Sequence, residues 1–125
     1  MNRKSEKYIL TEQMDWEELG GGVSRKILGW DNQIMMVKVK FEKGAKGAPH
    51  QHFHTQATYC VSGKFEFEID GVKQIVNAGD GVYMEPNLLH SAVCLEEGML
   101  IDTFSPIRED FIDGSGVSYF GDQDD

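Results

Sequence analysis

Four polar side chains alternate in the segment PHQHFHTQ: they are His50, His52, His54 and Gln56. In an extended strand, every second side chain points to the same face, so we expect these four groups to share one space. Imidazole nitrogen is the protein ligand that transition metals bind most often. The alternation therefore indicates a metal site or, as the alternative, a polar lining that hydrogen-bonds a substrate without a metal.

The remaining histidine, His90, lies in the segment EPNLLHSA and is a candidate for the same site. Gln56 is neutral, so three imidazoles and an amide oxygen would leave the double positive charge of a divalent cation in place. Inside a partly desolvated barrel, that charge attracts anions strongly. The residue types therefore favour a Lewis-acid site for a substrate with a carboxylate or enolate oxygen, and they suit oxygen chemistry less well.

A second group of candidate residues lies in LIDTFSPIRED, where Leu100, Asp102 and Phe104 share one strand face. If that face is the interior, Asp102 is a buried carboxylate, whose pKa tends to rise, and so a candidate general acid or base. Arg108 can hold a substrate carboxylate through two parallel hydrogen bonds. Phe104 offers an apolar wall against a sugar ring.

A structural alternative accounts for the same charges. In it, Asp102 pairs with Arg108, or Arg108 pairs with Glu109 or Asp110 at the surface. An aspartate on an inward strand face nevertheless favours a functional cavity, because a carboxylate is costly to bury.

The segments around these residues read as short strands separated by turns. Apolar and polar residues alternate from Met35 to Glu42, which predicts a half-buried strand. Asp70-Gly71 separates two further alternating runs, and this pair is a strong signal for a hairpin turn. GVYM, SAVCL and MLIDTF are three more predicted strands, with turns at Gly79–Gly81 and Glu96–Gly98.

Two segments show features of a short helix: MDWEELGGG, with Asp15 as its cap, and PIREDFI. The remainder predicts an all-β sandwich or barrel. We expect one domain at residues 15–112, an N-terminal lead-in at 1–14, and a mobile acidic, Gly-rich tail at 113–125. Alternatively, Tyr119 and Phe120 dock that tail on the domain or on a neighbouring subunit.

Composition excludes several classes of function. The chain has 125 residues and a formal net charge of -9, which argues against nucleic acid as a partner. No apolar run reaches the roughly 18 residues of a membrane span, and the first residues do not resemble a signal peptide. Cys60 and Cys94 form no CxxC pair, so we expect reduced, buried thiols in a cytoplasmic protein.

Two spaced motifs resemble those of the cupins. The first consists of Gly44, His50, His52, Gln56 and Gly63, and the second runs from Gly79 to His90, with fifteen residues between Gly63 and Gly79. The resemblance implies a single jelly-roll β-barrel of about six to eight strands around a divalent metal. It implies His50, His52 and His90 as three ligands and Gln56, where the family usually has glutamate, as the fourth. His54 falls outside that set, either behind the ligands or in the pocket wall, with ligation as the alternative.

The segments DWEELGGGVSRKILGWDNQIMMVKVKFEKGAKG and CLEEGMLIDTFSPIREDF, taken with Gln56, are similar to pectin-degradation cupins of the KdgF type. The similarity runs from about Asp15 to Phe111. It implies conversion of cyclic 4,5-unsaturated uronates, from pectin or alginate, to linear 5-keto-4-deoxyuronates. It also implies that Asp102, Arg108 and Phe104 line the active site. Phe53 and Thr55 stand where the family more often has proline and glutamate.

The expected partners are a small anionic sugar and a second copy of the chain in a homodimer, with neither nucleic acid nor membrane. The expected cofactor is one transition metal per chain, and nickel, zinc, iron and manganese all accept this ligand set. Two other functions fit the same residues. One is a non-catalytic cupin that binds sugars or anions, and the other is a metal-dependent cupin dioxygenase.

Overall fold

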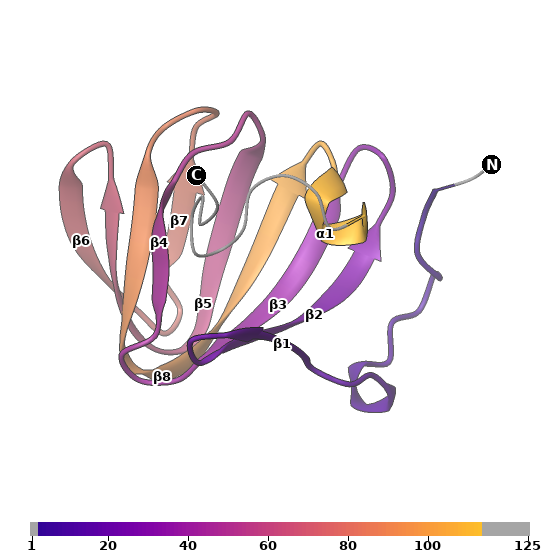
Figure 1. The fold of residues 1–125 in the computed structure, drawn as a ribbon, viewed down its shortest axis with the longest axis horizontal. Coiled ribbons are helices and arrows are strands. Elements are labelled where there is room, and N and C mark those ends of the chain that lie inside the picture. Colours follow the sequence, from indigo (N-terminus) through magenta and orange to yellow (C-terminus); the bar gives the residue numbers. More distant parts are fainter. Residues whose placement is uncertain (1–2, 114–125) are drawn as a thin grey trace.

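The computed structural model describes residues 3–113, and these form eight strands, a 3₁₀ turn and one short helix (Figure 1). The strands are β1 (Glu17–Gly20), β2 (Val23–Trp30), β3 (Met35–Phe41), β4 (Lys46–His50), β5 (Thr55–Ile69), β6 (Val72–Asn77), β7 (Gly81–Met84) and β8 (His90–Ser105). The turn is η1 (Thr11–Gln13), and the helix is α1 (Glu109–Asp113). The predicted all-β barrel is confirmed.

Two long strands, β5 and β8, belong to both layers of the barrel. The two strands pair with each other along nearly their whole length in antiparallel register, so the first half of β5 lies beside the last half of β8 and the last half of β5 beside the first half of β8. One layer contains β1, β2, β3 and β7 beside residues 98–104 of β8 and 55–60 of β5. The other contains β4 and β6 beside residues 90–96 of β8 and 64–69 of β5. Each long strand therefore bends where it passes from one layer to the next.

Two facing glycines occupy the bend. The register of β5 against β8 shifts between Cys60 and Phe65. Gly63 has a φ of 85° there, a conformation that side chains rarely adopt. A Cβ on Gly98 would collide with the Ser62 carbonyl oxygen and lie 2.7 Å from the Gly63 Cα. The two backbones therefore approach so closely that neither position accommodates a side chain.

The core fills the space between the layers. On β3, Met35, Val37 and Val39 are fully buried, as the alternation predicts. Phe41 packs edge-on against Phe65 of β5, with ring centroids 5.2 Å apart. Burying side chains of this size contributes about 1.5–3 kcal/mol each, so the inward faces of β3 and β5 account for much of the stability.

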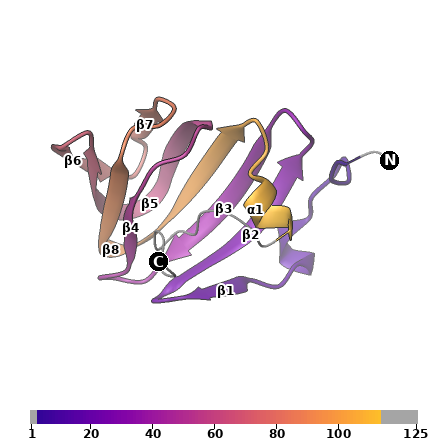
Figure 2. The ribbon, with the colours of Figure 1, turned by 45° about the horizontal axis from the view of Figure 1, so that its top comes forward.

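The ends of the described chain lie against the same side of the barrel. The lead-in contacts β2, since the Ser5 amide donates to the Trp30 carbonyl over 2.8 Å. The Arg3 guanidinium reaches α1 through a two-pronged bond to Glu109 at 2.7 and 3.1 Å. Helix α1 lies beside β2 and β3 in both views (Figures 1 and 2). The lead-in is therefore attached to the barrel.

Several predicted elements are confirmed. The alternating run is strand β3, and GVYM is β7. The β5–β6 hairpin turns at Asp70 and Gly71, with φ of 51° and 83°. The segment after Pro106 contains α1. Both cysteines are free and buried.

The helix predicted in MDWEELGGG is wrong. Glu17–Gly20 is strand β1, and the adjoining glycines Gly21 and Gly22 have φ of 63° and 87°. These conformations make a tight turn, so the segment folds back and pairs with β2. The glycines therefore form the turn of the β1–β2 hairpin, whereas the prediction placed them at the end of a helix.

The division of SAVCL and MLIDTF into two strands is also wrong. Both belong to β8, because Gly98 lets the strand bend instead of ending. The predicted mobile tail, with Tyr119 and Phe120, lies almost entirely outside the described residues. Neither helical segment between residues 3 and 113 is long and apolar enough to cross a membrane.

We expect Gly98→Ala to lower the free energy of unfolding by about 1–3 kcal/mol or more, because the methyl group meets backbone on the facing strand. Gly81→Ala is the matched control, since a Cβ there lies 3.6 Å from its nearest neighbour, an ordinary contact. Urea denaturation of the three proteins measures the difference. Equal stabilities of the two variants would contradict this account of the bend.

Candidate metal centre and pocket

Three histidines meet between the two layers of the barrel. His50 ends β4 and His90 begins β8, and the two are direct partners in the antiparallel register. His52 lies in the loop between β4 and β5, and its backbone carbonyl accepts a hydrogen bond of 2.7 Å from the Asn87 amide. The predicted single strand carrying His50 to Gln56 is therefore wrong. The chain turns from one layer to the other within the segment, although every second side chain is still turned inward.

Backbone carbonyls hold two of these rings in one orientation. The Nδ1–H of His50 donates to the Ala48 carbonyl at 2.8 Å, and that of His90 donates to the Leu88 carbonyl at 3.0 Å. Each ring therefore has an unprotonated Nε2. The Nε2 of His90 is buried and has no hydrogen-bond partner within residues 3–113. A buried nitrogen lone pair without a donor is what an electron-pair acceptor such as a metal ion satisfies.

The spacing and the charge state of the rings also fit a cation. One ring nitrogen from each of His50, His52 and His90 lies within 4.8 Å of the others. Burial lowers the pKa of His50 to about 4 and that of His52 to about 3, and it also lowers that of His90. The rings are therefore neutral at neutral pH, which is the form that binds metal. Together the three histidines fit a divalent metal site.

Gln56 lies beside this cluster, at the start of β5. Its Oε1 accepts a hydrogen bond of 3.1 Å from the Nε2 of His52, and its side chain is buried. The amide oxygen therefore points at the same space as the ring nitrogens. This position suits the predicted role of Gln56 as the fourth ligand, and that role stays a prediction.

His54 turns away from the cluster. Its Nε2–H donates to the Ile107 carbonyl at 3.0 Å, and Phe53 stacks on its outer face with centroids 4.0 Å apart. It is not one of the potential ligands that cluster within the described residues. Its bond to Ile107 instead holds the chain next to Arg108.

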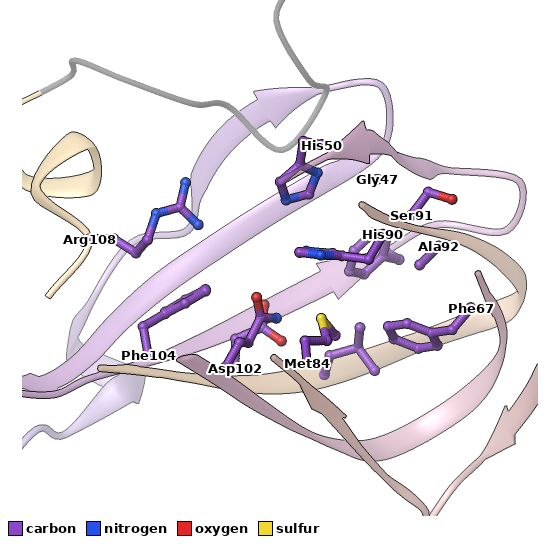
Figure 3. Close-up of a pocket in the computed structure, with 13 residues that line it drawn as sticks. Gly47, His50, Phe67, Met84, His90, Ser91, Ala92, Asp102, Phe104 and Arg108 are labelled. Atoms are coloured by element: carbon purple, nitrogen blue, oxygen red, sulfur yellow. The ribbon is translucent and has the colours of Figure 1, made fainter. Parts of the chain in front are cut away.

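A small pocket of about 40 Å³ adjoins His50 and His90. Figure 3 shows Arg108 and Phe104 at one end and Phe67 at the other, with His50, His90 and Asp102 between them. The two histidines and the carboxylate therefore lie next to one another in the middle of the pocket. Phe67 presents an apolar ring at the end away from Arg108, and Met84 lies between Phe67 and Asp102.

Asp102 faces the interior, as predicted, and is 4% exposed. Its Oδ1 accepts a hydrogen bond of 2.7 Å from the hydroxyl of Thr58, its direct cross-strand neighbour on β5. The sequence analysis missed Thr58. The signal was present, however, because Thr58 lies two residues after Gln56 and so shares its face.

Arg108 is almost fully buried and enters the pocket from the segment before α1. Its Nε and one terminal nitrogen donate to the two carboxylate oxygens of Asp110, at 3.0 and 2.8 Å. One of the structural alternatives is therefore present, although the pair is buried and not at the surface. The guanidinium also lies 5.1 Å from the Phe104 centroid and 4.3 Å from that of Phe111. These contacts orient Arg108 at the edge of the pocket.

Comparisons with known proteins agree with this architecture. The model of the cupin domain family matches residues 37–103. The pectin degradation protein KdgF of Dickeya dadantii (strain 3937) is 48% identical over 108 residues, which cover 85% of this chain and 98% of that protein.

Two solved structures are also similar. One is an RmlC-like cupin from Shewanella frigidimarina NCIMB 400, with a TM-score of 0.86, 46% identity, and coverage of 87% of this chain and 98% of that one. The other is KdgF from Halomonas sp., with a TM-score of 0.82, 38% identity, and coverage of 86% and 99%. Both similarities extend over nearly the whole of the other chain.

We expect His90→Ala to weaken zinc binding more than the roughly 10–100-fold that loss of an outer partner costs, because it removes a ligand atom. His54→Ala is the matched control and should retain metal, since its ring donates to a carbonyl. Calorimetric titration of the metal-free proteins measures both. Loss of binding in His54→Ala, with binding kept in His90→Ala, would reverse the assignment.

The metal-free protein should become less stable as the pH falls from about 6.5 toward 4. In the unfolded chain, histidine takes up a proton near pH 6.5, whereas the pKa of folded His50 is about 4 and that of His52 about 3. The unfolded state therefore binds more protons in this window, and stability falls by up to about 1.4 kcal/mol per pH unit for each such histidine. Melting temperatures at several pH values test this. His50→Gln should flatten the dependence, and an unchanged slope in that variant would contradict it.

Proposed function

Because the chain belongs to the cupin superfamily and, within it, to the family of the pectin degradation protein KdgF, we propose that it opens the ring of cyclic 4,5-unsaturated uronates. The products are linear 5-keto-4-deoxyuronates. Such unsaturated sugars are released when lyases cleave pectin or alginate.

The observation that carries the proposal is the combination of groups in one pocket. His50 and His90, which fit a cation, line the same cavity as the carboxylate of Asp102 and the guanidinium of Arg108. The substrate has matching parts, namely a carboxylate, a ring oxygen and an exchangeable hydroxyl proton. The neutral side chain of Gln56 also leaves the charge of a divalent cation uncancelled for such an anion.

The reaction is an isomerisation in which one proton moves. The proton leaves the hydroxyl on C1, the bond between C1 and the ring oxygen breaks to give an aldehyde and an enolate, and the proton added at C4 turns the enolate into the ketone. A bound divalent cation supplies Lewis acidity at the substrate oxygens. Asp102 is the group in the pocket that takes up and returns the proton.

Two other side chains hold the sugar. Arg108 binds the substrate carboxylate as a fixed cation, because Asp110 and the two phenylalanine rings orient its guanidinium. Phe104 presents an apolar face to the ring carbons. These three residues, Asp102, Phe104 and Arg108, are the predicted catalytic and binding groups.

The direct test mixes the metal-loaded protein with a 4,5-unsaturated uronate and follows loss of the double-bond absorbance against the spontaneous rate. Acceleration supports the proposal. Tight binding without acceleration would instead indicate a sugar-binding cupin, and oxygen consumption with another substrate would indicate a dioxygenase. Metal analysis of protein purified without added metal identifies the cation.

Asp102→Asn should lower kcat by about 10²–10⁴-fold, because the amide cannot take up the proton. The variant keeps an oxygen that accepts from Thr58, so the pocket should stay intact. Binding of metal and of a saturated uronate, which does not react, provides the control and should be unchanged. Wild-type kcat in this variant would remove Asp102 from the reaction.

Arg108→Ala should chiefly raise KM, because it removes the cation that holds the substrate carboxylate. Lys64→Ala is the matched control, since it removes one positive charge from an exposed residue of β5 that does not line the pocket. Steady-state kinetics on the unsaturated uronate distinguish the two. If both variants had the KM of the parent, the carboxylate would be held elsewhere.

The expected homodimer and cytoplasmic location stay predictions, because the structure describes a single chain. The proposed substrates include both galacturonate-derived and alginate-derived unsaturated uronates. The homodimer and the cytoplasmic location are also part of this proposal.

A further inference from the structure

We propose that Thr58 is a positioning residue that couples the side chain of Gln56 to the carboxylate of Asp102. The inference rests on the proposed function, since it concerns the group that moves the proton. Three hydrogen bonds join the residues in sequence. His52 Nε2 lies 3.1 Å from Gln56 Oε1, Gln56 Nε2 lies 3.0 Å from Thr58 Oγ1, and Thr58 Oγ1 lies 2.7 Å from Asp102 Oδ1.

The strand register brings these groups together. Gln56 and Thr58 are two residues apart on β5 and so point to the same face. Thr58 lies directly opposite Asp102 on β8. Gln56, Thr58 and Asp102 are 6%, 5% and 4% exposed, so bulk water competes little for these hydrogen bonds. The contact is therefore a buried polar link between neighbouring strands.

The chain of bonds runs in one direction. The nitrogen of Gln56 can only donate, so the Thr58 oxygen accepts from it and has its single proton left to donate. That proton goes to Asp102, whose carboxylate accepts. With the Gln56 amide turned over, its oxygen and Asp102 would compete for the one Thr58 proton. The observed orientation therefore satisfies both bonds and aims the Gln56 oxygen at the histidines.

This direction explains why an amide suits position 56. A glutamate in the same place would offer only acceptors to Thr58, which would then have one proton for two carboxylates. Gln56 donates instead, so the Thr58 hydroxyl is committed to Asp102 Oδ1. The bond restricts rotation of the Asp102 carboxylate and fixes how its oxygens face the pocket. Thr58 thus sets the geometry of proton transfer without itself touching the substrate.

The kinetic test uses Thr58→Val, which keeps the shape and removes the hydroxyl. We expect kcat to fall about 10–100-fold, as a small misplacement of a reacting group does, while KM and metal content stay unchanged. Thr58→Ser should restore most of the activity, because serine keeps the hydroxyl. Thr103→Val is the matched control, since Thr103 adjoins Asp102 on β8 but points to the opposite face, and it should behave like the parent.

A double-mutant cycle with Asp102→Asn separates this role from a structural one. If Thr58 acts through Asp102, Thr58→Val causes little further loss when Asp102 is already asparagine. Independent, multiplicative losses would overturn the proposal. So would unchanged kcat in Thr58→Val, failure of Thr58→Ser to restore it, or loss of metal in step with loss of activity.

A second measurement needs no activity. In the metal-free protein labelled with ¹⁵N, the side-chain NH₂ signals of Gln56, assigned by their absence in Gln56→Glu, should lie away from the values of a solvated amide. Thr58→Val should move them toward those values and Thr103→Val should not. If the unmodified protein does not accelerate uronate conversion, the proposed function fails. The NMR spectrum then tests the hydrogen bond between Gln56 and Thr58 independently of activity. Signals unmoved by Thr58→Val would overturn it.

Discussion

The close approach of β5 and β8 at Gly63 and Gly98 is the constraint on which the rest of the structure depends. Because a side chain at either position would collide with the facing backbone, the two strands bend together, and each contributes to both layers. The pocket lies between the layers and takes groups from each. His50 and His90 come from one layer, whereas Gln56 and Asp102 come from the other. The bend thus sets the distance between the candidate cation site and the carboxylate.

Charge within the pocket differs from charge over the whole chain. The formal net charge is -9, which disfavours anionic ligands at long range. Within the pocket, burial keeps the histidines neutral, while Arg108 stays charged and also lowers the pKa of His52 and His54. A cation held by neutral ligands would add to the positive potential there. Because Asp110 offsets the charge of Arg108 and Asp102 adds a carboxylate, that cation would be the main source of attraction for an anionic ligand in the pocket.

The segment that carries Arg108 is held by contacts from widely separated parts of the chain. His54 donates a hydrogen bond to the Ile107 carbonyl of this segment, and the Ile107 amide in turn donates to the Asn32 carbonyl at 3.2 Å. The guanidinium of Arg25 lies 4.1 Å from the Phe111 centroid and so stacks on that ring, as Arg108 does. A loop residue thereby acquires the rigidity of the barrel. A preorganised cation loses little entropy when it binds its ligand.

The sequence by itself determined the strands with clear alternation, the hairpin at Asp70-Gly71 and the identity of the potential ligands. These depend on local periodicity and on the few residues that a tight turn accepts. Only the tertiary structure decided that His50 to Gln56 turns a corner, that β8 is continuous, and that His54 faces Ile107. It also decided that Asp110 is the partner of Arg108 and that Thr58 joins Gln56 to Asp102. These facts depend on which strands lie opposite one another, and cross-strand register is a property of residues far apart in the chain.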